Sequence, residues 1–200
     1  YVATGDKEIF KDVTGNGGNC FLTEKEHDNG TDRIFEAYKK INSSNIDYII
    51  NLQGDEPMID IDDIKNLHNK TVHKKSEIAT LACKLKEEKT LENDNVVKVI
   101  TYEKLLNNNT SKAKFFLRKV LTNNHQNIYH HIGIYMYKVS ILEKFVNLKK
   151  TQNEILQKLE QLRAMENKIN IDVILANSSP IGVDTNQDYM EIKKLMEYKS

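Results

Sequence analysis

The sequence predicts one α/β domain of three layers, in which helices cover both faces of a mostly parallel sheet. Apolar strand-like runs alternate with helix-like segments along most of the chain, as in strands joined by crossover helices. Residues 46–53, "IDYIINLQ", read as an apolar strand, which is typical of a central parallel strand buried on both faces. The length of 200 residues suits a single domain.

The predicted strands are short apolar or alternating runs bounded by turn residues. In chain order they cover residues 1–4, 19–23, 46–53, 77–85, 95–101, 129–138 and 169–175. Residues 112–121, "KAKFFLRKVL", are ambiguous, and the extended form is favoured. In 129–138, "YHHIGIYMYK", the alternation places His131 and Tyr135 on one face.

The predicted helices carry apolar residues three and four positions apart. Residues 5–17 form a turn, a short helix and a Gly-rich turn, and 27–41 form the clearest helix. The remaining helices cover residues 60–72, 140–148, 153–167 and 186–198. In one continuous helix over 153–167, Arg163 borders the apolar face, where a charge must be paired.

Composition excludes several classes of function. A net charge of zero argues against nucleic-acid binding, and no apolar run approaches the 18 residues of a membrane span. Cys20 and Cys83 are too far apart for a metal or redox motif, and two free thiols suit a reducing cytoplasm. The start, "YVATGDKEIF", lacks the features of a signal peptide and does not begin with Met, so we expect residues upstream.

Two local features indicate chemistry. Asp55 follows the 46–53 strand in "NLQGDEPMI" (51–59), and ligands of α/β sheets bind beyond the carboxyl ends of strands. A cation site and a surface turn both explain this acid. Arginine occurs only at Arg33, Arg118 and Arg163 in a lysine-rich chain, which marks each as a candidate for planar pairing with a carboxylate or phosphate, with chance as the alternative.

Eight stretches, taken together with their order and spacing, carry a resemblance to a known family. They are "ATGD" (3–6), "HDNGTDR" (27–33), "NLQGDEPMI" (51–59), "IATLA" (78–82), "NDNVVKVI" (93–100), "HHIGIY" (130–135), "LEQLR" (159–163) and "GVDTNQD" (182–188). The chain resembles, over nearly its whole length, the 3-deoxy-manno-octulosonate (Kdo) cytidylyltransferases, or CMP-Kdo synthetases. "QGDEP" is shared with related sugar cytidylyltransferases, whereas "HIGIY" and "LEQLR" together are more specific.

This resemblance implies a Rossmann-like fold of the nucleotide-diphospho-sugar transferase type and a reaction. The anomeric hydroxyl of Kdo attacks the α-phosphorus of CTP, pyrophosphate leaves, and CMP-Kdo forms for lipopolysaccharide biosynthesis. It also implies a cytoplasmic homodimer, with residues 101–137 of the single 1–200 domain contributing to dimerisation and sugar binding. The alternatives are a cytidylyltransferase for another acidic sugar, such as a sialic acid, and a truncated, non-catalytic module that binds nucleotide or dimerises.

The resemblance also assigns the site residues. Asp55 and Asp184 would hold Mg²⁺, and Asp55 and Arg118 would be catalytic, with Arg118 facing the Kdo carboxylate. The residues implied for CTP are Gly30, Thr31, Arg33, Gln53 and Gly54, and those for Kdo are His131, Tyr135, Glu160 and Gln161. Thr31 also suits a helix N-cap, and both uses are compatible.

The chain departs from the family pattern at its start. The family begins with a strand and phosphate loop of the form "IIPARxxSxRxPxKPL", which is absent here. A partial sequence explains this better than an inactive, truncated protein. We therefore expect unpaired edges on the strands at 1–4 and 46–53, poor solubility, weak CTP binding and no turnover from residues 1–200 alone.

Overall fold

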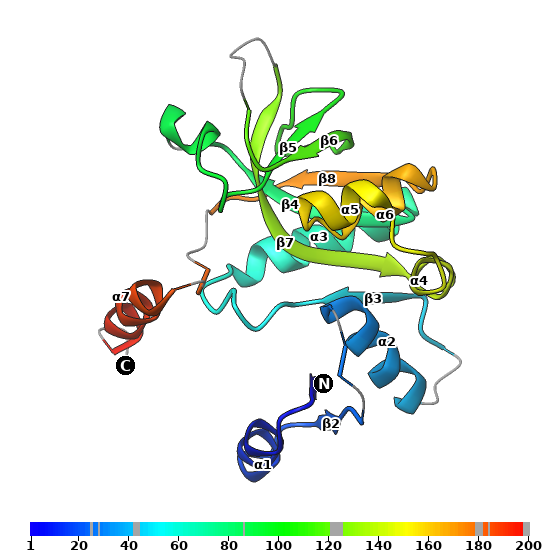
Figure 1. Ribbon diagram of the computed structural model, residues 1–200, viewed down its shortest axis with the longest axis vertical. Coiled ribbons are helices and arrows are strands. Elements are labelled where there is room, and N and C mark those ends of the chain that lie inside the picture. The colour runs from blue at the N-terminus through cyan, green and yellow to red at the C-terminus, as the bar shows by residue number, and fades with distance from the viewer. Residues whose placement is uncertain are drawn as a thin grey trace.

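A six-stranded mixed sheet forms the centre of the computed structural model, and a smaller unit made by the first strands and helix lies beside it (Figure 1). The structure describes residues 1–200 except 25, 28, 42–44, 86, 121–125, 179–181, 184 and 198–200. The strands are β1 (Val2–Thr4), β2 (Cys20–Leu22), β3 (Tyr48–Asn51), β4 (Ile78–Cys83), β5 (Lys98–Thr101), β6 (Ser111–Leu117), β7 (Ile128–Lys138) and β8 (Ile171–Leu175). The helices are α1 (Lys7–Gly15), α2 (Gly30–Ile41), α3 (Ile61–Lys74), the 3₁₀ turn η1 (Glu88–Leu91), α4 (Val139–Val146), α5 (Gln152–Gln157), α6 (Gln161–Glu166) and α7 (Asn186–Glu197).

The main sheet has the order β3-β7-β4-β8-β6-β5, and β5 also pairs with β7. Only β4 and β8 pair in parallel within it, whereas β7 runs antiparallel to β3, β4 and β5. The α/β class is confirmed, but the sheet is mixed and the prediction of a mostly parallel sheet is wrong. The prediction that residues 46–53 form a central parallel strand buried on both faces is also wrong, because β3 lies at the edge of the described sheet, pairs antiparallel with β7 and is mostly half-buried. An apolar run favours a parallel sheet in general but does not fix the direction of the neighbouring strand.

A bulge interrupts the pairing of β7 with β4. Thr80 lies opposite Tyr135 and Leu81 lies opposite Ile132, so two residues of β7, Gly133 and Ile134, have no partner in β4. Bulges bend a strand and redirect its side chains. Here the bulge lies where β7 borders the candidate site described below.

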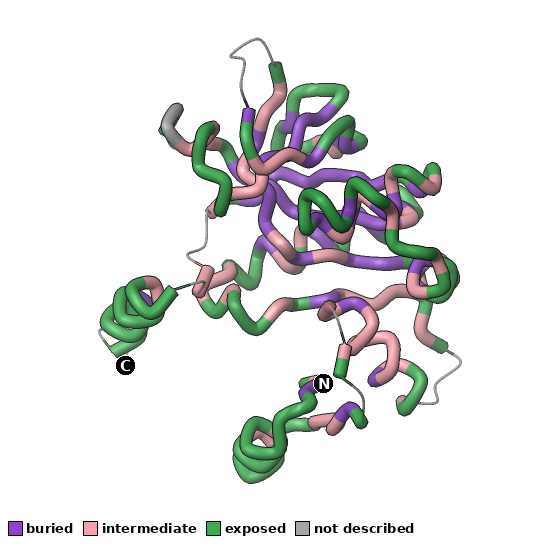
Figure 2. Tube along the Cα trace, viewed as in Figure 1, coloured by how far each residue is buried: buried purple, intermediate pink, exposed green. Residues whose placement is uncertain are grey.

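The core consists of two clusters on opposite faces of the sheet, and the three-layer arrangement is confirmed. Leu67 of α3 packs on one face against Leu81, Ile134 and Ile174. Phe145 and Leu142 of α4 pack on the other face, together with Ala164 of α6. Figure 2 shows this buried centre along β4, β7 and β8.

The predicted helix over 153–167 is two helices. Lys158 has a left-handed backbone (φ 52°) and ends α5, and α6 begins at Gln161. Ile155 of α5 is 61% exposed, so no single apolar face runs along this segment into the core. The pairing of Arg163 is nevertheless confirmed, because its guanidinium donates to both carboxylate oxygens of the buried Glu154.

The N-terminal unit is separate from the main sheet. β1 pairs in parallel with β2 alone, and β3 pairs with β7 alone, among the described strands. The prediction that both strands keep an unpaired edge is confirmed for this part of the chain. Helix α1 has no buried residue (Figure 2).

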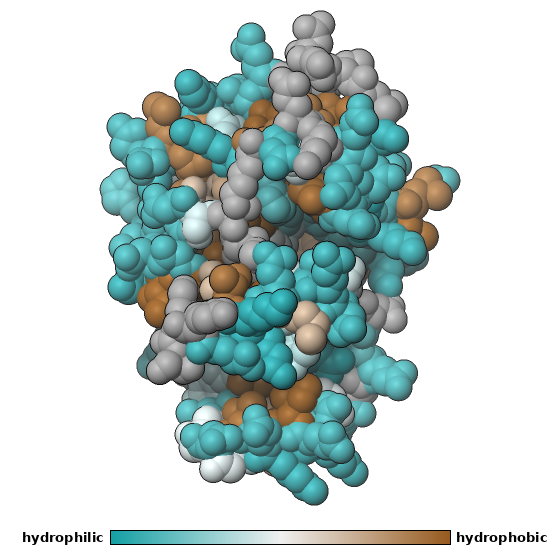
Figure 3. All heavy atoms as spheres, turned by 90° about the vertical axis from the view of Figure 1, so that its left-hand side faces the viewer, coloured by the Kyte–Doolittle hydropathy of each residue, from teal (hydrophilic) through white to brown (hydrophobic). Residues whose placement is uncertain are grey.

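The outer surface is largely polar. On the face shown in Figure 3, hydrophilic side chains predominate and hydrophobic ones form several separate groups. No helix built from the described residues has both the length and the apolar character needed to cross a membrane.

Candidate active site

A cavity of about 590 Å³ opens between the end of β3, the bulged part of β7 and the start of α6. It brings together six of the residues that the sequence predicts for the site: Gln53, Asp55, Arg118, His131, Tyr135 and Gln161. These residues come from four separate parts of the chain. Their convergence makes this cavity the candidate active site.

Asp55 lies in the loop after β3, at the rim of the cavity, and is exposed. Its backbone carbonyl accepts a hydrogen bond of 2.8 Å from the Val183 N–H, so the segment at 182–183 is anchored beside it. Asp184, the other predicted magnesium ligand, lies outside the described residues. Among the residues that are described, no group of three or more His, Cys, Asp or Glu side chains is arranged to hold a metal ion.

The aromatic wall of the cavity is built on β7. The rings of His131 and Tyr135 have centroids 5.4 Å apart, which confirms that they share a face, and Phe116 meets His131 edge-on at 5.1 Å. The His131 side chain also lies 3.0 Å from the Thr80 hydroxyl. Burial, and secondarily the charge of His130, lowers the pKa of His131 to about 3, so its ring is neutral near pH 7.

Two cations hold the opposite wall. The Arg118 guanidinium donates to the carbonyls of Gln157 (2.7 Å), Asp94 (3.1 Å) and Lys158 (3.1 Å). The Lys98 ammonium donates to the carbonyls of Asn93 and Val96 at 2.8 Å each, and also to that of Arg118. These bonds fix the loop at 93–97 and the α5–α6 junction, and burial lowers the pKa of Lys98.

The predicted Glu-Gln pair divides between two environments. Gln161 lines the cavity, whereas Glu160 is absent from its lining and accepts a hydrogen bond of 2.9 Å from the Thr31 hydroxyl. Burial raises the pKa of Glu160 to about 7, although Thr31 and Arg163 oppose this shift. Of the four residues predicted for the sugar, His131, Tyr135 and Gln161 line this cavity and Glu160 does not, and sugar binding by any of them stays a prediction.

The residues predicted for the nucleotide lie at the start of α2 and in the loop after β3. A Cβ atom on Gly30 would come within 3.0 Å of the Gln53 side-chain amide, so glycine permits this close contact. The Asn29 side chain accepts the Asp32 N–H at 2.8 Å and thereby caps α2. The prediction that Thr31 is the cap is wrong, because Thr31 lies inside the helix and is bonded to Glu160. Gly54 is exposed.

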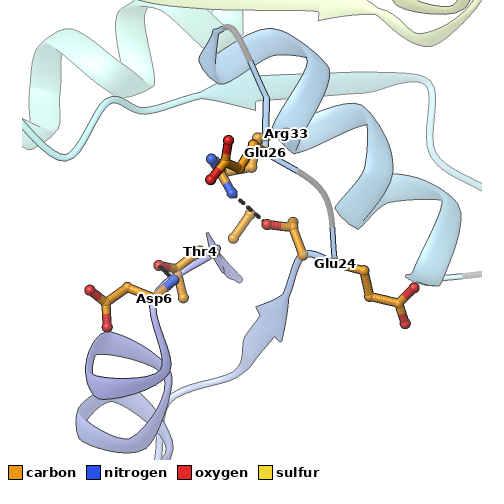
Figure 4. A pocket seen from close by; sticks show the side chains of 8 residues that line it. Thr4, Asp6, Glu24, Glu26 and Arg33 are labelled. Atoms are coloured by element: carbon orange, nitrogen blue, oxygen red, sulfur yellow. Dashed lines mark hydrogen bonds between the residues drawn. The ribbon is translucent and has the colours of Figure 1, made fainter.

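Arg33 lines a second cavity, of about 510 Å³, between α2 and the β1–β2 sheet (Figure 4). Its guanidinium donates to the Thr23 hydroxyl. The other ionisable groups around this cavity are acidic: Asp6, Glu24 and Glu26. Three acids beside one arginine do not suit a polyphosphate.

Several residues around the main cavity were missed by the sequence predictions. They include Asn93, Asn95 and Val97 of the loop that Lys98 and Arg118 hold. The sequence feature that could have revealed this loop is Lys98 within the apolar strand "VVKVI", because a charge in such a strand needs polar partners. Thr80 in "IATLA" is the corresponding signal in β4.

Comparisons with known proteins agree with this fold. A family model described as cytidylyltransferase matches residues 1–171. A 3-deoxy-manno-octulosonate cytidylyltransferase of Brucella anthropi is 40% identical over 188 residues, which are 94% of this chain and 75% of that protein. The protein of the same name from Brucella ovis is 39% identical over 188 residues, with 94% and 74% covered.

Solved structures give the same result. A CMP:2-keto-3-deoxy-manno-octonic acid synthetase complexed with CTP superposes with a TM-score of 0.85 at 29% identity, covering 98% of this chain and 79% of that one. A UDP-glucose pyrophosphorylase without ligand, at 14% identity, has a TM-score of 0.65 over 97% of this chain and 70% of its own, and shows the fold alone. The fold and cavity thus define a nucleotidyltransferase-type α/β protein. The chain belongs to the cytidylyltransferase family.

Proposed function

We propose that this protein activates Kdo with CTP, giving CMP-Kdo and pyrophosphate for lipopolysaccharide biosynthesis. The observation that carries the proposal is the convergence of Asp55, Arg118, His131, Tyr135 and Gln161 on one cavity, in a chain 40% identical to a Kdo cytidylyltransferase. The cavity volume of about 590 Å³ lies within the usual range for small-molecule sites.

The sugar end of the site is lined by His131, Tyr135 and Gln161. In our proposal these side chains bind sugar hydroxyls and orient the anomeric hydroxyl toward the α-phosphorus, which is the main task of the protein in phosphoryl transfer. Arg118 lies on the opposite wall, bonded to three neutral carbonyls, so its positive charge is not cancelled by any of these partners. This charge favours an acidic sugar in the same cavity.

We propose that Asp55 and Asp184 hold Mg²⁺ next to the phosphates. The exposed Asp55 carboxylate supplies the oxygen donor that Mg²⁺ prefers, and the Val183 N–H bond anchors the residue before Asp184 on Asp55. When bound, the ion would neutralise charge that develops on the phosphate oxygens. Within the chain itself, Gly30 and Gln53 place the start of α2 against the loop that carries Asp55.

We propose that the protein is a homodimer, with residues 101–137 in the interface. Supporting this, β6 exposes Phe115 (47%), and Leu117, Leu162 and Met165 line a groove next to it. Cys20 and Cys83, both described by the structure, form no disulfide bond, which supports a reducing, cytoplasmic compartment.

Pyrophosphate release tests the proposed function. The protein extended upstream of Tyr1 by a family-like "IIPAR…KPL" segment is incubated with CTP and Mg²⁺, and with Kdo or a sialic acid as acceptor. We expect turnover with Kdo and little with sialic acid. Equal turnover with both acids, or a preference for sialic acid, would contradict the assignment to Kdo.

A further inference from the structure

Thr80 is the one polar residue in the apolar sequence of β4, Ile78–Cys83, and it is completely buried next to the cavity. Its Oγ1 atom lies 2.8 Å from the carbonyl oxygen of Ile134, within the bulge in β7, and 3.2 Å from that of Ile132, the residue just before the bulge. The same Oγ1 lies 3.0 Å from Nε2 of His131. The Thr80 hydroxyl therefore lies within hydrogen-bond distance of three groups.

The number of protons available in this cluster decides which groups donate hydrogen bonds and which accept them. A threonine hydroxyl has one proton to donate and two lone pairs that accept. Carbonyl oxygens only accept, so the Thr80 proton goes to the bulge, and to Ile134 by distance. The contact with His131 then requires a proton on Nε2, donated to Thr80 Oγ1.

This fixes the tautomer of His131. With a proton on Nε2 and a neutral ring, Nδ1 keeps its lone pair and can only accept a hydrogen bond. The ring cannot turn freely, because Phe116 packs on it edge-on and Tyr135 packs beside it. Nδ1 makes no hydrogen bond within the described part of the chain, and His131 lines the cavity.

We propose that Thr80 is a positioning residue that holds His131 as a pure hydrogen-bond acceptor, and that Nδ1 of His131 therefore binds a hydroxyl donor of the substrate rather than a carboxylate or phosphate. The second half of this inference rests on the proposed function, since it requires a polyhydroxylated substrate in this cavity. The first half concerns the folded chain alone. Burial of the ring, which lowers the pKa of His131 to about 3, keeps the neutral form across the working pH range.

The tautomer is read directly from the ¹⁵N chemical shifts of the imidazole nitrogens of the protein in solution. We expect a protonated Nε2 and an unprotonated Nδ1 for His131 in the unaltered protein. Thr80→Val removes the hydroxyl at nearly equal volume, and the fixed tautomer should give way to a mixture or reverse. Thr80→Ser keeps the hydroxyl and should restore the original signals.

A matched control is Thr71→Val. Thr71 is also completely buried and its hydroxyl also donates to a carbonyl, that of Leu67, but it lies on α3 away from the cavity. Both valine variants should lower the melting temperature, because each leaves a buried carbonyl with one partner fewer. Only Thr80→Val should change the His131 signals.

The substrate half is tested by kinetics with CTP and Kdo, with each variant made in the protein extended upstream of Tyr1 by the family-like "IIPAR…KPL" segment. Thr80→Val should raise the KM for Kdo about three- to tenfold, the worth of one neutral hydrogen bond, with little change in the KM for CTP. Thr80→Ser and Thr71→Val should leave both values near those of the unaltered protein.

Three results would overturn the inference: a protonated Nδ1 in the unaltered protein, an unchanged tautomer in Thr80→Val, or an unchanged KM for Kdo in a variant whose tautomer has changed. If Thr80→Val does not fold, the unaltered protein and Thr80→Ser still report the tautomer. Failure of the proposed function can be told apart from failure of this inference. Absence of turnover with Kdo would not affect the ¹⁵N measurement, which alone would then decide whether Thr80 sets the tautomer of His131.

Discussion

The two ends of the candidate site are built differently. The sugar end is built on β7, α6 and the loop at 93–97, where Lys98 and Arg118 donate to six different backbone carbonyls and Arg163 pairs with a buried Glu154. The proposed nucleotide end, formed by the start of α2 and the loop after β3, lies next to a unit where β1 pairs only with β2 among the described strands and α1 buries nothing. The sugar end is fixed by the protein core, whereas the nucleotide end depends on the few contacts that α2 makes.

Those contacts are specific. The Thr31 hydroxyl bonds to Glu160, Gly30 meets Gln53, and Ala37 is buried where α2 packs on α4 and β3. The comparison teaches that the part of the cavity proposed for the sugar is preorganised by packing, whereas the part proposed for the nucleotide is positioned through a small number of links to the same core. Each of the following experiments tests one side of this difference.

The largest effect is expected where the two ends meet, at Asp55. Asp55→Asn removes the charge proposed to hold Mg²⁺ and should lower kcat by about 100- to 1,000-fold, the scale of losing one group that stabilises charge in the transition state. The exposed position predicts an unchanged melting temperature. Asp62→Asn, an exposed surface acid paired with Lys65, is the control. Turnover within a few-fold of the unaltered protein would contradict the catalytic role of Asp55.

The second prediction concerns the nucleotide end. Residues 1–200 alone should bind CTP weakly, because the cavity at Arg33 is lined by Asp6, Glu24 and Glu26 and carries no second basic residue among those described. Placing a family-like "IIPAR…KPL" segment before Tyr1 should raise CTP affinity about 100-fold, as two charge-assisted hydrogen bonds of about 1.5 kcal/mol each would. Calorimetric titration measures both proteins. Tight CTP binding by residues 1–200 would show that other groups hold the phosphates.

The third prediction concerns the sugar end. Gln161→Ala should raise the KM for Kdo about five- to tenfold and leave the KM for CTP nearly unchanged, because Gln161 lines the cavity beside the residues that we propose bind the sugar. Gln157→Ala, an exposed glutamine of α5 whose backbone but not side chain bonds to Arg118, is the matched control. Equal rises in both KM values would indicate that Gln161 supports the structure in general.

Sequence patterns were sufficient where local periodicity decides the outcome. His131 and Tyr135 share a face as predicted because the bulge adds two residues to β7, an even number that preserves alternation. The helix break at Lys158 was not predictable in this way, because a left-handed helix end usually carries glycine or asparagine. The apolar strands likewise did not reveal that β7 runs antiparallel between β3 and β4.

Roles that depend on distant partners were also hidden. The sequence places Glu160 next to Gln161, and only the fold shows that one turns toward α2 and the other toward the cavity. Lys98 and Thr80 were visible as polar residues in apolar strands, but their acceptors lie in other segments of the chain. Such residues can be flagged from sequence as needing partners, and the partners themselves require the structure.

The smallest effect is expected from Glu160, the link between the two ends. Its pKa is raised from 4.5 to about 7, chiefly by burial, so the folded protein keeps this proton while the unfolded chain loses it. This group therefore makes the free energy of unfolding fall as pH rises from about 4.5 to 7, by roughly 1–2 kcal/mol after allowance for its partial exposure. Other ionisable groups that affect its environment are Asp32, Tyr135, Tyr137, Glu154 and Arg163.

Because His131 has a lowered pKa and contributes stability that rises with pH below about 6.5, the Glu160 effect is measured as a difference between two proteins. Melting temperatures of the unaltered protein and of Glu160→Gln are compared between pH 5 and pH 7.5. Glutamine can still accept the Thr31 hydroxyl but has no proton to lose, so the variant should gain a few degrees over the unaltered protein as pH rises. Parallel curves would mean that Glu160 ionises at an ordinary pH. In that case the link between α2 and the sugar end carries a charged carboxylate throughout, with Arg163 as its partner at 3.9 Å.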